Sequence, residues 1–143
     1  MKKWLWIALC AFMPLLWAVE PPAGWLTDFE TAKTLAIKGK KPVLVLFSGT
    51  DWCPPCKRLR RNLLDTPEFQ KLIQEKCVAL YIHVPRGEDE AFDKMMTHFP
   101  FVPLTGVPTV IVTDSGITRI LAWIESRTLD GFAAGIGKAA KSL

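Results

Sequence analysis

The sequence is poor in the residues that build metal centres and disulfide-rich scaffolds. Its 143 residues include four cysteines and two histidines. A small domain held together by disulfides needs a larger and even set of cysteines, and a closed zinc site needs four ligands. Cys53 and Cys56 form the one closely spaced pair, and Cys77, His83 and His98 follow at irregular spacing. The composition therefore excludes a disulfide-stapled scaffold and argues against a zinc site.

The chain also lacks a concentrated block of basic charge. The formal net charge is +4 at pH 7, and Lys2 and Lys3 account for part of it. Apart from clusters at 38–41 and 57–61, the lysines and arginines are scattered. Proteins that bind nucleic acids gather such residues into one patch or stripe. We therefore expect no nucleic-acid partner, and in the absence of a dimerisation segment we expect a monomer.

No hydrophobic run reaches the roughly 20 residues that a membrane-spanning helix needs. An uncharged, largely apolar run covers 4–17, directly after Lys2 and Lys3 and before the small residue Ala18. This layout is typical of a secretory signal peptide, so we predict a signal peptide over 1–18 and one domain over 19–143. Retention of the leader as a short membrane anchor is the alternative. The expected location is the periplasm, an oxidising compartment in which disulfides persist.

The rest of the chain alternates between helical and strand patterns. Continuous apolar, β-branched runs indicate buried strands, and apolar residues at helical spacing indicate helices. The order is helix, strand, helix, strand, helix, hairpin, helix, which indicates an α/β fold with a mixed central sheet of about four strands flanked by helices. The predicted strands are 43–47, 78–84, 110–112 and 117–123. The predicted helices are 27–39, 53–64, 67–76, 88–99 and 128–141.

The candidate catalytic residues are Cys53 and Cys56, at the point where a buried strand turns into a helix. Cysteines three apart at a helix start can form a small disulfide ring. The first sulfur then lies near unpaired backbone amides and the positive end of the helix dipole, which stabilise a thiolate. Cys53 would attack a substrate disulfide, and the less exposed Cys56 would resolve the mixed disulfide. The two sulfurs carry the electrons, so no metal or organic cofactor is expected.

Pro54 and Pro55 separate the two cysteines and bear on the direction of electron flow. Proline fits the first helical turn, but it has no N–H group to donate to the Cys53 thiolate. A less stabilised thiolate makes the reduced form less stable and the protein a stronger reductant. The sequence therefore favours a disulfide reductase. The alternatives are a disulfide oxidase or isomerase, and a chaperone or metal-binding module that uses the same groove.

The stretch 43–59, VLVLFSGTDWCPPCKRL, resembles the first strand and active site of the thioredoxin superfamily. A second matching element is Gly106-Val107-Pro108-Thr109. The chain is most similar to exported thioredoxin-like proteins of the DsbH type. The resemblance implies a thioredoxin fold, a cis peptide bond before Pro108, and a substrate-holding lip formed by Val107 and Pro108. Trp52, Pro54 and Pro55 would complete the surface that binds substrate.

The same resemblance implies partners. The substrates would be disulfides in other exported proteins, and the electron donor would be a membrane thiol-transfer protein of the DsbD type. The chain departs from the thioredoxin pattern at three positions. Phe47 replaces a buried aspartate that accepts the proton of the resolving thiol, a residue near Leu80 replaces its lysine partner, and Gly49 replaces an aromatic residue. Cys56 therefore lacks the family's usual base, which favours a specialised partner.

Overall fold

The structure, a computed structural model, describes residues 19–143, so the predicted signal peptide over 1–18 lies outside the described residues. Its centre is β1 (Val43–Ser48), in which every residue is buried. β1 pairs in parallel with β2 (Val78–His83) and antiparallel with β3 (Thr109–Thr113), and β3 pairs antiparallel with β4 (Ile120–Trp123). The strand order is β2-β1-β3-β4. The predicted four-stranded mixed sheet is confirmed.

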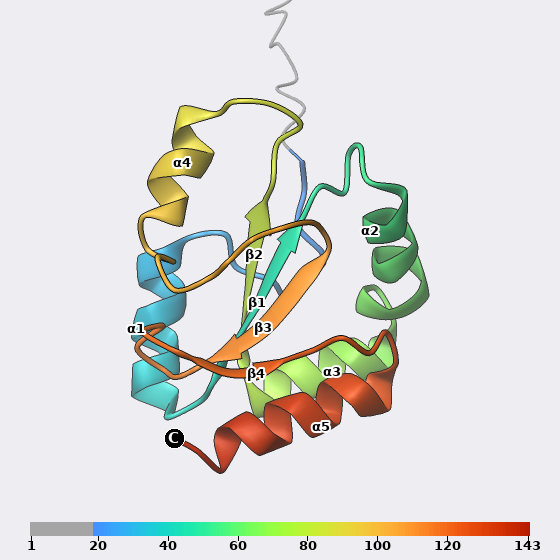
Figure 1. The fold of residues 1–143 in the computed structure, drawn as a ribbon. Coiled ribbons are helices and arrows are strands. Elements are labelled where there is room, and N and C mark those ends of the chain that lie inside the picture. Colours follow the sequence, from blue (N-terminus) through green and yellow to red (C-terminus); the bar gives the residue numbers. More distant parts are fainter. Residues whose placement is uncertain (1–18) are drawn as a thin grey trace, which may run out of the picture.

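Helices cover both faces of this sheet (Figure 1). One face carries α1 and α4, and the other carries α2, α3 and α5 (Figure 1). The elements are α1 (Phe29–Gly39), α2 (Pro54–Leu59), the π-helical segment η1 (Arg60–Leu64), α3 (Pro67–Lys76), α4 (Glu90–Met96) and α5 (Leu129–Ala140). The helix predicted over 53–64 thus continues beyond Leu59 with π-helical geometry, which the apolar spacing alone does not distinguish from α-helix.

Two apolar cores lie on the two faces because successive side chains of a strand point to opposite sides. The α1 core contains Phe47 and Leu80 from the sheet together with Phe29 and Ala32 of α1. The α5 core contains alternate strand residues such as Leu44 and Leu46, with side chains from the helices on that face, among them Phe69, Ile73, Phe132 and Ile136. Both faces of β1 are therefore covered, which explains its uninterrupted apolar sequence.

The hairpin strand predicted over 117–123 begins later, at Ile120. Ile117 has a positive φ of 54°, which no strand contains. The Asp114 carboxylate accepts hydrogen bonds from the backbone amides of Thr118 and Arg119 at 2.8 and 2.9 Å. Burial opposes ionisation of Asp114, but these hydrogen bonds prevail and lower its pKa. The Asp114 carboxylate thus accepts hydrogen bonds from two amides that would pair with β3 if the strand began earlier.

The segment before α5 lies unusually close to that helix. A Cβ at Gly135 would lie 2.9 Å from Cγ1 of the buried Ile124, and a Cβ at Gly131 would overlap the Ser126 side chain. Because these glycines have no side chain, residues 124–126 pack directly on α5. The contact fixes the position of Arg127, which follows this segment and bears on the site described below.

Candidate functional site

The predicted pair Cys53 and Cys56 is joined by a disulfide at the start of α2. Cys53 is the N-cap residue, with extended backbone, and Cys56 lies in the first helical turn. Both are buried, but Cys53 lines a surface groove and Cys56 is not among the residues that line it. An incoming thiolate or disulfide therefore meets Cys53 before Cys56.

The electrostatic environment of the Cys53 sulfur depends on few amides. The Cys56 amide donates to Cys53 Sγ at 3.3 Å. Pro54 and Pro55 occupy the two positions between the cysteines and are exposed. Neither has an N–H group, and the Lys57 amide donates instead to the Cys53 carbonyl at 3.1 Å. A Cys53 thiolate would thus have one first-turn amide aimed at it, besides the helix dipole.

Opposite the disulfide lies the segment that leads into β3. The Val107–Pro108 peptide bond is cis. Cys53 Sγ lies 3.8 Å from the Val107 carbonyl oxygen. The Thr109 hydroxyl donates to the Gly106 carbonyl at 2.7 Å and braces the turn. The carbonyl of Val107 therefore faces the space that a substrate sulfur attached to Cys53 would enter.

A groove of about 550 Å³ runs past the disulfide, and we name it the Trp52 groove. It brings together most of the residues that we predicted to bind substrate. Residues after β2 and before β3 complete it, and the sequence analysis did not find them. The lining residues are Trp52, Cys53, Pro54, Pro55, Val84, Pro85, Arg86, Leu104, Gly106 and Val107. The walls of this groove are predominantly apolar, as is usual for ligand-binding grooves.

Pro108, which we predicted to hold substrate, lies elsewhere. It lines a second groove, of about 340 Å³, on the other side of the lip. Pro55 lines both grooves, so the two meet at the start of α2. Arg58, Asn62 and Arg127 are the polar residues of this second groove, which we name the Arg127 groove.

Trp52 is held in place from two sides. Its Nε1 donates to the Val84 carbonyl at 2.8 Å, and its indole ring covers Gly49 so closely that a Cβ there would overlap it. The glycine that replaces the family's aromatic residue thus makes room for Trp52. The sequence held a signal for Val84: β1 and β2 are parallel, so the loops after them emerge at the same edge of the sheet.

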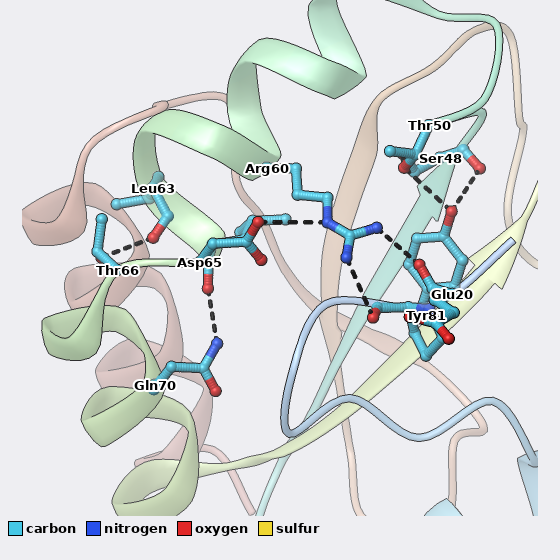
Figure 2. Close-up of polar contacts among 11 residues, drawn as sticks. Glu20, Ser48, Thr50, Arg60, Leu63, Asp65, Thr66, Gln70 and Tyr81 are labelled. Atoms are coloured by element: carbon cyan, nitrogen blue, oxygen red, sulfur yellow. Dashed lines mark hydrogen bonds and ion pairs between the residues drawn. The ribbon is translucent and has the colours of Figure 1, made fainter.

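Polar contacts fasten the loop before the disulfide and the end of the helix after it (Figure 2). The buried Tyr81 hydroxyl lies 3.1 Å from the Thr50 hydroxyl and donates to the Ser48 carbonyl at 3.4 Å. Arg60 pairs with Asp65 at 3.4 Å and donates to the Glu20 carbonyl at 2.6 Å. The cysteine segment is therefore held at both ends.

His83 also has a partner that the sequence analysis missed. Its Nε2 lies 3.7 Å from Asp51 Oδ1, two residues before Cys53. Its Nδ1 is buried with no hydrogen-bond partner in the described part of the chain. The other histidine, His98, stacks on Phe29 with ring centroids 4.1 Å apart and belongs to the packing beside α1.

Phe47 stands where the thioredoxin pattern has a buried aspartate, and its surroundings are apolar. Phe47 is fully buried in the α1 core, edge-on to Phe99 with centroids 5.4 Å apart. Its cross-strand neighbour is Ile82; Leu80 pairs with Val45 two positions away. Phe47 and Ile82 thus form an apolar pair where the thioredoxin pattern has an aspartate and a lysine.

Cys77 lies at the opposite end of the sheet from the disulfide. Cys77 directly precedes Val78, and Val78 pairs with Val43, the first residue of β1. Cys53, in contrast, comes after Ser48, the last residue of β1. The thiol is buried, with its sulfur 3.8 Å from the Ile73 carbonyl. Burial raises the pKa of Cys77 to about 12, against a smaller lowering by Lys41.

We therefore expect Cys77 to resist alkylation. In the reduced protein at pH 8, iodoacetamide should modify Cys53 first and leave Cys77 unmodified until urea unfolds the chain, because only thiolates react. Peptide mapping by mass spectrometry gives the rate at each site.

The folded protein also keeps the Cys77 proton to higher pH than the unfolded chain, so the free energy of unfolding should fall as pH rises from 9 towards 12. Cys77→Ala should remove this part of the slope, and equal labelling rates at Cys53 and Cys77 would contradict the raised pKa of Cys77.

Nowhere in residues 19–143 do three His, Cys, Asp or Glu side chains gather closely enough to hold a metal ion. Within the same residues, no helix is long and apolar enough to cross a membrane.

Comparison with known proteins links this site to a family. The model of a family described as thioredoxin-like matches residues 24–115. The thioredoxin-related protein DsbJ of Chlamydia pneumoniae is 36% identical over 69 residues, which are 46% of this chain and 20% of that protein. The chain thus spans about a fifth of the length of this relative.

Solved structures share the fold at low identity. DsbH oxidoreductase superposes with a TM-score of 0.64 and 17% identity, over 88% of this chain and 92% of that one. The disulphide isomerase of Xylella fastidiosa Temecula1 gives a TM-score of 0.55 and 20% identity, over 87% and 98%. A thioredoxin from Thermus thermophilus gives 0.55 and 17%, over 81% and 83%. The predicted thioredoxin fold is confirmed. The chain belongs to the thioredoxin-like family, and its Cys-x-x-Cys motif holds a disulfide that joins Cys53 and Cys56.

Proposed function

We propose that this chain is an exported thiol–disulfide oxidoreductase that reduces disulfides in other exported proteins. The observation that carries the proposal is the position of Cys53, which is bonded to Cys56, lines the apolar Trp52 groove and has its Sγ 3.8 Å from the Val107 carbonyl oxygen. A substrate segment lying in this groove would bring its own sulfur next to Cys53. The layout of residues 1–18 supports export, and the periplasm is the proposed location.

The reaction exchanges two electrons between two disulfides. In the reduced protein the Cys53 thiolate attacks one sulfur of the substrate disulfide, and the other substrate sulfur leaves as a thiolate. Cys56 then loses its proton and attacks Cys53 Sγ, which releases the second substrate thiolate and forms the Cys53–Cys56 bond. Substrate disulfide is reduced to two thiols, and the protein dithiol is oxidised. No metal or organic cofactor takes part, and because Phe47 offers no base, the Cys56 proton passes to water or to another group.

Each turnover leaves the protein oxidised, so a donor must return two electrons to the Cys53–Cys56 disulfide. We propose a membrane thiol-transfer protein of the DsbD type as this donor. Such a donor uses the same exchange chemistry in the opposite sense, with its own thiolate attacking Cys53. The groove that accepts substrate therefore also accepts the donor, in alternation.

The two prolines between the cysteines support reduction of substrate as the direction of electron flow. Because Pro54 and Pro55 leave the Cys56 amide as the first-turn donor to Cys53 Sγ, the thiolate is weakly stabilised and the disulfide form is favoured. We expect a reduction potential below about −200 mV, measured by equilibrium with glutathione or a thioredoxin of known potential. A value near that of DsbA, about −120 mV, would make the protein an oxidase instead.

A further inference from the structure

The Arg127 groove adjoins the disulfide, and the proposed exchange reaction does not use it. Pro55 connects it to the Trp52 groove, and Pro108 follows Val107, whose carbonyl faces Cys53 Sγ. A polypeptide that places a cysteine at Cys53 therefore has neighbouring residues within reach of both grooves. Whatever lines the Arg127 groove can select among substrates.

This groove is basic. Two of its polar lining residues are the exposed arginines Arg58 and Arg127, and the third is the neutral Asn62. None of the described residues that line it carries a carboxylate. The exposed Lys57 and Arg61 on the same helical stretch add charge of the same sign.

Neither Arg58 nor Arg127 forms an ion pair with a carboxylate of the described residues. Among residues 19–143 the ion pairs are Arg60 with Asp65 and His83 with Asp51. Arg127 instead donates to backbone carbonyls, from Nη2 to Pro108 at 3.2 Å and from Nη1 to Ile124 at 3.1 Å. These bonds hold the guanidinium at the groove and leave its charge unpaired.

From this arrangement we propose that Arg58 and Arg127 form a specificity site for an acidic residue next to the reactive cysteine of the partner protein. The inference rests on the proposed function and names a substrate class for it. A glutamate or aspartate side chain would enter the Arg127 groove while the partner's cysteine meets Cys53. A carboxylate matches the donors of a guanidinium in both charge and geometry, and Arg127 is already oriented by its hydrogen bonds to backbone carbonyls.

The test compares two synthetic disulfide peptides. They share one sequence, except that glutamates flanking the cysteine in one are glutamines in the other. The second-order rate constant for oxidation of the reduced protein by each peptide gives an acidic-to-neutral ratio. We expect a ratio of about 10 at low ionic strength, falling towards 1 in concentrated salt, because exposed charges are screened.

Variants show whether this ratio comes from the two arginines. Arg58→Gln and Arg127→Gln should each lower it about threefold, and Arg58→Glu should bring it below about 1, an inversion that a merely structural role would not produce. Arg119→Gln is the matched control, because Arg119 lies beside the start of β4 at the end of the sheet away from the disulfide; its ratio should equal that of the unmodified protein.

The outcomes separate the inference from the function beneath it. Equal rates with both peptides, or a ratio unchanged in all arginine variants, would overturn the specificity site while leaving the reductase intact. If neither peptide is reduced, the proposed function fails and the specificity site fails with it.

Discussion

Cys53→Ser should abolish insulin reduction, with a loss of at least about 10³-fold in rate. A serine hydroxyl is not ionised at neutral pH, whereas disulfide exchange requires a thiolate at this position. Cys53 is also the cysteine that lines the Trp52 groove, whereas Cys56 is buried and does not line it. Turbidity from the precipitating insulin B chain, with dithiothreitol as the electron source, measures the rate.

Cys56→Ser distinguishes the roles of the two sulfurs. This variant can still attack but cannot resolve, so it should accumulate a mixed disulfide between Cys53 and the substrate, visible by mass spectrometry without reducing agent. Cys77→Ala is the control, because its thiol lies at the other end of the sheet; it should retain activity. Insulin reduction that persists in Cys53→Ser would contradict the role of Cys53 as the nucleophile, and insulin that binds without being reduced by the unmodified protein would point to a binding module.

Phe47→Asp should destabilise the fold by at least about 4 kcal/mol. The substitution restores the residue type that thioredoxins carry here, but it removes a fully buried ring that packs edge-on against Phe99. Truncating a buried Phe to Ala costs about 3–5 kcal/mol, and a carboxyl with no polar partner adds a desolvation penalty. Urea unfolding followed by circular dichroism measures the loss.

The pH dependence of this variant identifies the cause. Burial raises the pKa of an introduced carboxyl, so the folded variant keeps its proton to higher pH than the unfolded chain does. Its stability should therefore be greatest below the ordinary aspartate pKa and should fall as pH rises through that value and up to the raised one. Phe47→Leu, which leaves a small cavity and no charge, should lose about 1–2 kcal/mol with no such pH dependence. A stable Phe47→Asp protein at pH 7 would mean that a partner reaches the carboxylate.

The parts of the fold that depend on local patterns could be predicted from the sequence. The apolar run at 43–47 is a buried strand, and Thr66-Pro67 opens α3, with the Thr66 hydroxyl accepting from the Phe69 amide. The position of the cysteine pair at a strand-to-helix junction follows from the same two patterns. Each of these signals lies within a few residues of the structure that it determines.

Features that depend on distant contacts could not be predicted. Nothing near Arg127 indicates that it reaches the Pro108 carbonyl, because that contact depends on the hairpin and on the close packing of Ile124 against Gly135. The Asp51–His83 pair likewise needs the parallel register of β1 and β2. The apolar, β-branched Ile117 fits the pattern of a strand, but its φ is positive. It lies in the turn in which the Asp114 carboxylate accepts a hydrogen bond from the Thr118 amide.

The contacts of Arg60 have a mechanical consequence. Its backbone amide donates to the Cys56 carbonyl, and its guanidinium holds the carbonyls of Glu20 and Pro21 (Figure 2). One residue therefore couples the helix of the disulfide to the point where the chain enters the domain. Because Glu20 and Pro21 lie at the start of the described residues, a force applied there would reach the helix of the disulfide through Arg60.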